Sequence, residues 1–460
     1  MIFSTKKLTI ALIILLFGSL LSACGPSADE LAATYVAQTA AAVTNTPTVI
    51  PTSTPIPTST LPPTPTETPT ITPTLSPESL TIPSGEPVNI GYLLWESNRL
   101  GVDSIRGVEI AIADFGELHG HPVELTGFDT ECNAFAGQQG SRILMQDESI
   151  IGVIGTTCSL AGLQAAPIVS DNNRVLISPS NTGADLTAPD THVAGYFRTS
   201  PNDLVQIKAA AQYAYNELGA KKIATVRGDT DIYHRLYSVA LCEFFEELGG
   251  ECVLDQVKAQ GSTYVIPIIN GLVDAAPDAI YFISWDFNEG AALLSEAKKS
   301  PNLADTAIFV WEAYNNPGFL DVTGEAAVGV YVSATSFDID WNSELYQDFL
   351  EKHRNEYNEE PLDIYHSYAY DATTLLLKAI AQVAVPGADG SLIVDPLAVR
   401  DTMYGKVEFQ GISGWISCSQ YGDCAVSASG KVYQFITGDP DTFNPGPEDS
   451  LSSNPVQVWP

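Results

Sequence analysis

IGVIGTTCSLAG, residues Ile151–Gly162, begins as an apolar run and then changes to a glycine, two threonines, a cysteine and a serine. The apolar run, Ile150–Gly155, predicts a buried strand, and the small residues beyond it predict a helix that starts near Leu160. A buried strand followed closely by a helix is the repeating unit of parallel α/β sheets. Residues in such a connection lie at the carboxyl end of the strand, where these sheets bind ligands.

The same alternation of strand and helix extends through most of the chain. Strands are predicted at Val88–Leu94, His121–Gly127, Val175–Ile177, Lys222–Val226, Cys252–Gln256, Ala279–Ser284 and Ala307–Trp311. Helices are predicted at Gly107–Phe115, Gly137–Gln146, Leu163–Val169, Pro201–Leu218, Leu236–Leu248, Ile266–Val273 and Gly290–Lys298. This rhythm predicts an α/β fold with parallel sheets covered on both faces.

The chain is long and strongly acidic. Its 460 residues exceed what one ordinary core accommodates, so two or more lobes are expected. The formal net charge of -34 would repel both nucleic acid and anionic membrane surfaces. Both are therefore excluded as partners that the protein surface binds directly.

The N-terminus has the organisation of a secretory signal. Lys6 and Lys7 precede the apolar run Leu8–Leu21, which is too short for a membrane span. The run leads into the tetrapeptide LSAC, which ends at Cys24 and resembles a bacterial lipobox. The prediction is a signal peptide over residues 1–23 and a lipid-modified Cys24, with an ordinary secretory signal as the alternative. Such a protein is extracytoplasmic and is held at the membrane by its acyl chains alone.

Low complexity follows the anchor. Residues 24–43 form the lipid-anchored N-terminus, and residues 44–85 are dominated by Thr and Pro with almost no charge. Such a segment cannot bury a core, and its prolines favour polyproline II, so a disordered stalk is predicted. At ~3.1 Å per residue the stalk would reach roughly 130 Å. Pro, Asp, Asn and Ser also predict a loose tail over residues 438–460.

Cysteine usage fits an oxidising compartment. Seven cysteines, less the one in the lipobox, leave six, for which sequence alone allows fifteen pairings. A metal site is the alternative, but no CxxC or HxxxH spacing supports one, so neither a metal nor a cofactor is predicted. Pairing near neighbours predicts the disulfides Cys132–Cys158, Cys242–Cys252 and Cys418–Cys424.

Two loops combine hydroxyl groups with strand ends. Thr156–Ser159 follow the strand of the opening stretch, where the next helix presents unpaired backbone N–H groups that favour a carboxylate. The alternative is that Ser159 only caps this helix. A second loop, SPSNTGADLT at Ser178–Thr187, has the same hydroxyl-rich character and carries Gly183 for a turn. Composition alone would also suit a plain surface turn at this second loop.

Several segments stand in a characteristic order. They are NIGYLLWESNRLGVDSIRGVEIAIADF from Asn89, FDTECN from Phe128, IIGVIGTTCS from Ile150, VLISPSNTGADLT from Val175, FRTSPND from Phe197, YAYDATTLLLKAI from Tyr368 and FQGISGWISCSQYGD from Phe409. Together they resemble the type I periplasmic binding proteins of the branched-chain amino-acid (Leu/Ile/Val) kind, the solute receptors of ABC importers. The resemblance covers roughly residues 86–437.

The resemblance implies a clamshell of two Rossmann-like lobes with parallel sheets, joined by three chain crossings that form a hinge. Lobe 1 would comprise about residues 86–201 and 335–417, and lobe 2 about 202–334 and 418–437. An enzyme is not expected, since the sequence contains no G-x-S-x-G, P-loop or HExxH motif. The S-x-x-K match at Ser295 is explained by helical spacing.

The resemblance also implies a zwitterion site. In the family, two loops hold the ligand carboxylate and an acidic residue on the facing lobe takes the ligand ammonium. The disulfide Cys132–Cys158 matches a family disulfide that would brace the first of these loops. The implied ligand-binding residues are Cys158, Ser159, Ser180 and Thr182 for the carboxylate, Glu312 for the ammonium, and Tyr233, Trp285, Asp286, Trp95 and Leu100 around the rest of the ligand.

The first loop departs from the family pattern. Relatives that receive aliphatic amino acids often have a short Gly-, Ser- and Pro-rich turn before a tyrosine, whereas this chain reads WESNRLG from Trp95. Leu100 takes the place of the aromatic residue, and Trp95 and Arg99 are bulky additions. The side-chain pocket is therefore expected to differ from that of a leucine receptor, and an amide or small carboxylate stays open as the ligand.

The function implied by the resemblance is a monomeric, lipid-anchored receptor that delivers an amino acid to an ABC permease and its ATPase. A sensory receptor is the alternative, because the same clamshell could present a bound ligand to a membrane kinase or chemoreceptor. Neighbouring permease genes would favour transport, and a neighbouring sensor kinase gene would favour sensing.

Overall fold

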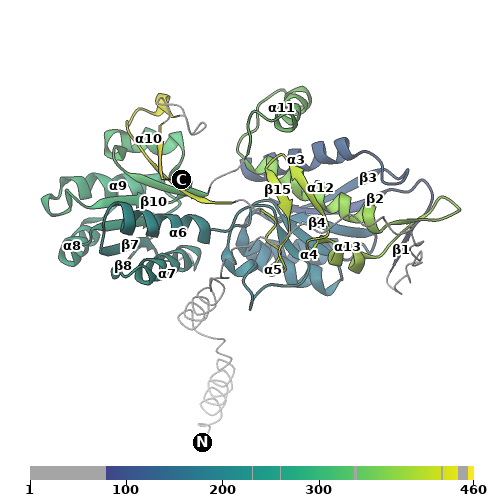
Figure 1. The fold of residues 1–460 in the computed structure, drawn as a ribbon, viewed down its shortest axis with the longest axis horizontal. Helices are drawn as coiled ribbons and strands as arrows, with labels where there is room; N and C mark the ends of the chain where they lie inside the picture. The colour runs from purple at the N-terminus through teal and green to yellow at the C-terminus, as the bar shows by residue number, and fades with distance from the viewer. Residues whose placement is uncertain are drawn as a thin grey trace, which may run out of the picture. The chain divides into compact units, whose positions relative to one another are not determined.

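The computed structural model describes residues 79–229, 232–259, 261–335, 339–425, 428–443 and 454–459, without the side chains of Ile232 and Tyr233. The predicted signal peptide, Cys24, residues 24–43 and most of the predicted stalk lie outside the described residues. Two large sheets organise the described chain, and each packs with its own set of helices (Figure 1). No helix in the described ranges has the length and apolarity of a membrane span.

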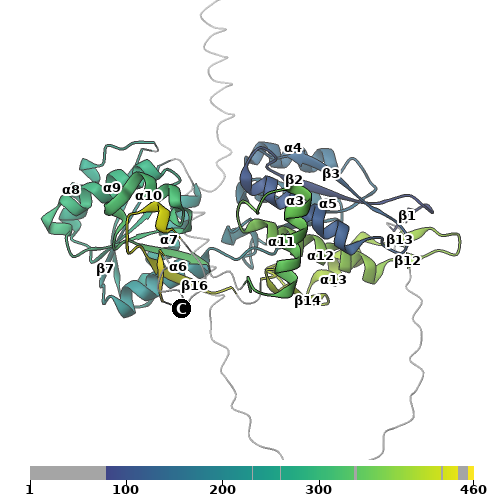
Figure 2. The same cartoon turned by 90° about the horizontal axis from the view of Figure 1, so that it is seen from above.

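The first sheet has five parallel strands in the order β3-β2-β4-β5-β6. They are β2 (Val88–Leu94), β3 (Val123–Asp129), β4 (Ile150–Gly155), β5 (Val175–Ser178) and β6 (Tyr196–Arg198). One group of helices, on one face of the sheet, is α3 (Arg99–Phe115), α12 (Tyr365–Val383) and α13 (Pro396–Met403) (Figure 2). The other group, on the opposite face, is α4 (Ala134–Leu144) and α5 (Ser159–Asp171).

The opening stretch forms the centre of this sheet. Every residue of β4 is buried, because helices cover the strand on both faces, and a continuous apolar run is what such a strand requires. Gly152 permits the close approach of α12, since a Cβ at this position would lie 2.7 Å from Leu376 Cδ1. The strand therefore directs the following residues, Thr156–Ser159, to the carboxyl edge of the sheet.

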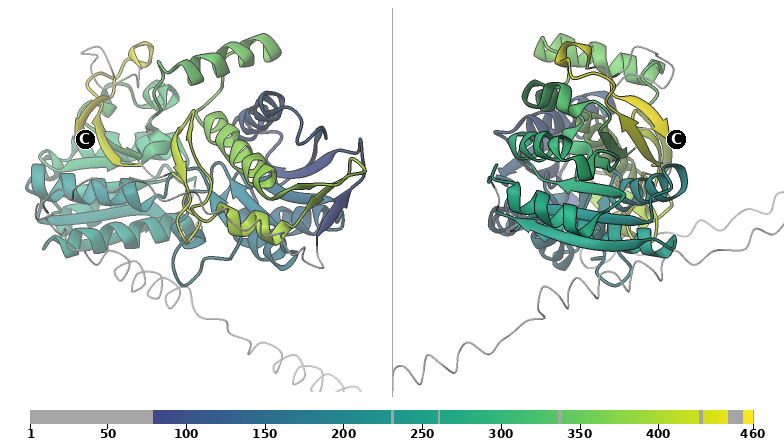
Figure 3. Two further views of the ribbon diagram at one scale, coloured as in Figure 1. Left: turned by 45° about the vertical axis from the view of Figure 1, so that its right-hand side comes forward. Right: turned by 90° about the vertical axis from the view of Figure 1, so that its left-hand side faces the viewer.

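The second sheet has seven strands in the order β17-β16-β11-β10-β9-β7-β8. Its parallel strands are β7 (Lys222–Gly228), β8 (Glu251–Lys258), β9 (Ala279–Ile283), β10 (Ala307–Val310) and β11 (Tyr331–Thr335). Two antiparallel strands, β16 (Gly430–Gln434) and β17 (Val456–Trp459), complete one edge (Figure 3). The associated helices are α6 (Leu204–Gln212), α7 (Ile232–Glu247), α8 (Ile266–Ala275), α9 (Phe287–Lys299) and α10 (Pro317–Thr323).

Smaller elements surround the first sheet. Helix α11 (Glu344–Tyr357) packs through Tyr346 and Phe349 into an apolar cluster with α3. The strands are β1 (Leu80–Ile82), β12 (Val385–Pro386) and β13 (Leu392–Val394) in one small sheet, and β14 (Glu408–Gly411) and β15 (Gly414–Ser417) in a hairpin. All three predicted disulfides are present: Cys132–Cys158, Cys242–Cys252 and Cys418–Cys424.

Two predicted boundaries at the N-terminal side are wrong. The stalk was predicted to extend to residue 85, but Leu80–Ile82 pair with β13 as an antiparallel strand, and Ile82 is buried. Helix α3 begins at Arg99, well before the predicted Gly107, because the Asn98 side chain caps it by accepting the Leu100 N–H at 3.0 Å. The short strand is set by a partner strand far along the chain and the cap by one side chain, and apolar periodicity reveals neither.

The predicted loose tail is also wrong at its end. Strand β17 pairs with β16, and the buried Asn454 side chain fixes its start. Asn454 Oδ1 accepts the Ile436 N–H at 3.0 Å, and Nδ2 donates to the Thr437 carbonyl oxygen at 3.1 Å. Four residues, three of them apolar, were too short a signal beside the polar composition of the rest of the tail.

Truncation of the chain after residue 453 is expected to lower the free energy of unfolding by roughly 2 kcal/mol. The deleted strand contributes half-buried side chains that pack on the core of the second sheet, among them Val458 and Trp459. Burial of apolar side chains of this size is worth about 1.5–3 kcal/mol each when complete. Urea denaturation of the two chains measures the difference, and equal midpoints would mean that β17 adds nothing to the fold.

Candidate functional site

Three loops meet at the carboxyl edge of the first sheet. They follow β2, β4 and β5, which are neighbours in the strand order. Thr157 Oγ1 accepts the Trp95 backbone N–H at 2.9 Å, and Ser159 Oγ accepts the Gly183 N–H at 3.1 Å. The structure therefore brings Trp95, the Thr156–Ser159 loop and the SPSNTGADLT loop together, as adjacent parallel strands require.

Ser159 does not cap α5, so the capping alternative is wrong. The N-cap residue is Cys158, whose side chain belongs to the disulfide and makes no cap hydrogen bond. Within the described part of the chain, the backbone N–H groups of Ser159 and Leu160 have no acceptor, and the Ser159 hydroxyl acts only as an acceptor. An anion would satisfy these donors, because a helix N-terminus also carries a partial positive charge.

The second loop is held by hydrogen bonds to the Thr156–Ser159 loop and to the start of α6. Ser180 is buried and its hydroxyl donates to the Thr157 carbonyl oxygen at 2.8 Å. Asn181 Nδ2 donates to the Thr156 carbonyl oxygen at 2.7 Å, which locks the two loops to each other. The Thr182 carbonyl oxygen accepts the Asp203 N–H at 3.0 Å. The Ser180 hydroxyl proton is therefore already donated to the Thr156–Ser159 loop, while Thr182 links the second loop to the start of α6.

Arg198, the last residue of β6, donates hydrogen bonds to the backbone of the second loop. Its guanidinium is fully buried, and Nη1 donates to the carbonyl oxygens of Asn181 at 3.1 Å and Gly183 at 2.7 Å. Its Nε lies 2.5 Å from Asp423 Oδ1. Sequence reasoning placed Arg198 in a family segment but gave it no role. The available signal was an arginine at the end of an otherwise apolar strand.

Glu312 lies just beyond the carboxyl end of β10. Thr335 Oγ1, at the end of the neighbouring strand β11, lies 3.5 Å from Glu312 Oε2. Gln206 is also beside the Glu312 carboxyl, and its Nε2 donates to Asp203 Oδ1 at 3.0 Å. Burial, and then the Asp203 carboxylate, raise the pKa of Glu312 to about 8. A cation placed here would favour the ionised form and offset both effects.

Sequence reasoning missed three neighbours of Glu312. Asp203 and Gln206 come from the start of α6, and Tyr365 comes from the start of α12. Burial raises the pKa of the Tyr365 hydroxyl, and the Glu312 and Asp363 carboxylates raise it further, which places the ring near Glu312. Asp203 stood within the segment FRTSPND, and Tyr365 stood three residues before YAYDATTLLLKAI. Only Asp203 lay inside a recognised segment, and no direct signal marked Gln206 or Tyr365.

The remaining predicted residues have different surroundings. Trp285 is 54% exposed, and its ring lies 4.2 Å from that of Trp311. Asp286 is the N-cap of α9, where its Oδ1 accepts the Asn288 N–H at 2.8 Å, so a structural role already accounts for it. Leu100 is half-buried in the first turn of α3. Tyr233 belongs to α7, but its side chain lies outside the described residues.

Two α/β sheets whose carboxyl edges both carry candidate ligand groups define the class of two-lobed solute-binding proteins. The chain belongs to the periplasmic binding protein family, whose model matches residues 88–427. Members of this family are extracytoplasmic substrate-binding proteins and not enzymes, as the sequence predicted.

Named relatives and solved structures agree with this family. The leucine-, isoleucine-, valine-, threonine- and alanine-binding protein of Pseudomonas aeruginosa is 24% identical over 301 residues, 64% of this chain and 76% of the relative. A substrate-binding protein of a chemotactic signal transduction system from Halobacterium salinarum is 26% identical over 216 residues, 44% of this chain and 50% of the relative. The crystal structure of a leucine-binding protein from Thermotoga maritima has a TM-score of 0.62 at 23% identity, over 76% of this chain and 96% of that one.

These similarities confirm the predicted type I periplasmic binding protein fold with its parallel sheets. The chain spans about half the length of some curated relatives that it matches, 47% in one case. At this level of identity the solved structures establish the fold alone.

Proposed function

We propose that this protein is a lipid-anchored, extracytoplasmic receptor that binds an amino acid between two lobes and delivers it to an ABC permease and its ATPase. The observation that carries the proposal is a pair of complementary subsites. The open N-terminus of α5 with the Ser159 hydroxyl suits a carboxylate, and the Glu312 carboxyl suits an ammonium. An amino acid carries both groups on one carbon.

The energetics favour a ligand that fills both subsites. Moving either charged end out of water without a partner would cost several kcal/mol, whereas charge-assisted hydrogen bonds at both ends offset that cost. The bond between the Thr182 carbonyl oxygen and the Asp203 N–H supports a short distance between the subsites, because Asp203 also neighbours Glu312. In this proposal residues 86–201 and 335–417 form one lobe, residues 202–334 and 418–437 form the other, and a bend at the three crossings closes them.

A ligand-sensing receptor of the same fold is the second candidate function. The similarity to the chemotactic substrate-binding protein of Halobacterium salinarum favours it. An amide or a small carboxylate is the alternative ligand class, and neither would need the Glu312 carboxylate.

The experiment that tests the proposal is calorimetry and thermal shift on purified protein that has been unfolded and refolded to remove bound ligand. The ligands are the amino acids, simple amides and small carboxylates. A ligand that binds the folded state raises the melting temperature by mass action. Binding of amides or carboxylates alone would refute the zwitterion site. Loss of ligand uptake in a deletion strain supports transport, and normal uptake with a lost signalling response supports sensing.

The affinity for an amino acid is expected to rise with pH up to about 8. Burial and the Asp203 carboxylate raise the pKa of Glu312 to about 8, so at pH 6 the carboxyl is mostly protonated in the ligand-free protein. Because the ligand ammonium pairs with the ionised form, the apparent Kd should fall about tenfold per pH unit between pH 6 and 7, with a proton released on binding. Calorimetry in buffers of different ionisation enthalpy measures this proton release. A Kd independent of pH over this range would contradict the assignment.

A further inference from the structure

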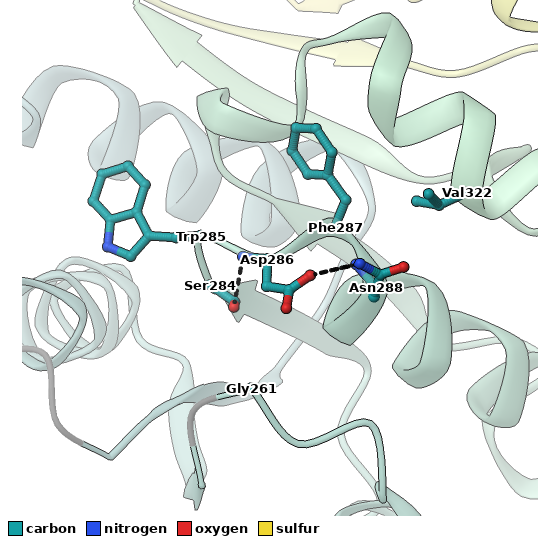
Figure 4. A pocket seen from close by; sticks show the side chains of 7 residues that line it. All are labelled: Gly261, Ser284, Trp285, Asp286, Phe287, Asn288 and Val322. Atoms are coloured by element: carbon teal, nitrogen blue, oxygen red, sulfur yellow. Dashed lines mark hydrogen bonds between the residues drawn. The ribbon is translucent and has the colours of Figure 1, made fainter. Parts of the chain in front are cut away.

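A pocket of about 440 Å³ lies beside Trp285, at the carboxyl end of strand β9 in the second sheet. Its lining residues are Gly261, Ser284, Trp285, Asp286, Phe287, Asn288 and Val322 (Figure 4). Neither Glu312 nor any loop of the first sheet lines this pocket. The charged ends of an amino acid bound as proposed above would therefore leave it unfilled.

The pocket is adjacent to the ammonium subsite. Strands β9 and β10 are parallel neighbours, with Phe282 opposite Val310, so their carboxyl ends lie about 5 Å apart. Two hydrogen bonds join the turn at Glu312 to the pocket loop: Trp311 Nε1 donates to the Ser284 carbonyl oxygen at 2.8 Å, and the Tyr314 hydroxyl donates to the Asp286 carbonyl oxygen at 3.0 Å.

The two directions away from Glu312 differ in chemistry. On one side, strand β11 brings Thr335 to the Glu312 carboxyl, 3.5 Å from its Oε2. On the other side, strand β9 leads into Trp285 and the pocket. An ammonium group held at Glu312 therefore has Thr335 on one side and the pocket on the other, which leaves the pocket side for the rest of the ligand.

The apolar part of the lining is poorly covered. Val322 is 44% exposed and Trp285 more so, while Phe287 is half-buried. Exposed apolar surface around a pocket favours an apolar occupant, by about 25 cal/mol for each Å² that the occupant removes from water. Aromatic rings such as that of Trp285 also gain from edge-to-face or offset contact with a second ring.

The polar lining is already engaged. Asp286 Oδ1 accepts from the backbone N–H and from Nδ2 of Asn288, at 2.8 and 3.1 Å. The Ser284 hydroxyl donates to the Glu289 carboxylate and accepts the Asp286 N–H. Glu289 is itself paired with buried Lys258, Nζ to Oε1 at 2.7 Å. These bonds fix the walls of the pocket and do not single out a charged side chain as the occupant.

We propose that this pocket receives the side chain of the bound amino acid, and that the ligand class is amino acids with a large aromatic side chain. The inference rests on the proposed function. A dry apolar cavity of about 150 Å³ already holds benzene. A pocket of about 440 Å³ has room for an indole or phenol ring, whereas a short aliphatic chain would leave much of it empty.

The test is calorimetric titration of the refolded protein with L-phenylalanine, L-tryptophan, L-leucine and L-alanine. Phenylalanine or tryptophan is expected to bind at least tenfold more tightly than leucine. Val322→Trp places a ring in the pocket and should weaken aromatic binding at least tenfold, with Val322→Phe giving a smaller loss. Alanine, which is too small to reach the pocket, should bind unchanged and so reports that the variants are folded. Ile143→Trp on α4, equally exposed at 44%, is the matched control.

Two results would overturn this inference alone. Tighter binding of leucine than of either aromatic amino acid, with Glu312→Gln abolishing all binding, would refute the pocket assignment and leave the zwitterion site standing. Undiminished aromatic affinity in Val322→Trp would do the same. Failure of every amino acid to bind the wild-type protein would instead overturn the proposed function itself.

Discussion

Replacement of Glu312 by glutamine is expected to weaken the binding of an amino acid at least 100-fold. The side chain keeps its size and can still accept the hydrogen bond from Thr335, but it loses the charge that the ligand ammonium needs. Removal of one partner of a buried charge pair costs about 3–5 kcal/mol, and each 1.4 kcal/mol is about tenfold in Kd. Calorimetry at pH 8 measures the change under conditions in which the wild-type carboxyl is substantially ionised.

The same substitution is expected to raise the melting temperature of the ligand-free protein above pH 7. Burial and Asp203 raise the folded-state pKa of Glu312 to about 8, whereas an unfolded glutamate titrates near about 4.3. The native state therefore binds this proton more tightly, and its stability falls as the pH rises between these two values. Glutamine is neutral throughout and escapes that loss. Below pH 4 the two proteins should have the same stability.

Glu351→Gln is the matched control for both effects. Glu351 is exposed on α11, so its substitution should change neither affinity nor the pH dependence of melting. A Glu312→Gln protein that is less stable at every pH and also fails to bind would assign Glu312 to the fold. A Glu312→Gln protein that is more stable but no longer binds ligand would show that Glu312 lowers the stability of the fold and is needed for binding.

The fold was predictable to the extent that burial leaves a local pattern. Strand β4 lies under helices on both faces, so it reads as an unbroken apolar run, and its neighbours give the same signal. Element ends were less predictable, because a single contact decides them. The Asn98 cap extends α3 by two turns, and the buried Asn454 amide fixes the start of β17. Neither contact leaves a periodic signal in the sequence.

The candidate site divides in the same way. The hydroxyl loops could be found because each follows a recognisable strand, and neighbouring parallel strands bring their carboxyl ends together. Arg198, Asp203 and Tyr365 could not be assigned roles, because their partners are remote in the chain. Arg198 and Asp423, for example, are 225 residues apart. For Asp286 the family resemblance implied a ligand contact, and sequence reasoning did not foresee that its side chain also caps α9.

Replacement of Arg198 by methionine is expected to lower the free energy of unfolding by about 3–5 kcal/mol. The guanidinium is fully buried, and its loss would remove its hydrogen bonds to the carbonyl oxygens of Asn181 and Gly183 and to Thr187 Oγ1. Each hydrogen bond from a charged group is worth about 1.5–3 kcal/mol, and the two carbonyl oxygens keep only the Ser200 hydroxyl and the Leu186 N–H as donors. Burial already raises the pKa of nearby Asp185, and Arg198 is the charge that opposes this rise. Asp423 contributes less, because its side chain is 37% exposed and water screens the pair.

Urea denaturation of Arg198→Met beside Arg354→Met separates a buried arginine from an exposed one. Arg354 pairs with Glu360 at 3.1 Å, but both side chains are about half exposed, so its loss should cost within about 0.5 kcal/mol. Arg198→Lys keeps the charge but has no planar fork to reach Asn181, Gly183 and Asp423 together, and should fall between the two. Equal midpoints for Arg198→Met and Arg354→Met would mean that the second ligand loop keeps its shape without this side chain. In that case the bonds of Ser180 and Asn181 to the β4 loop are sufficient to hold it.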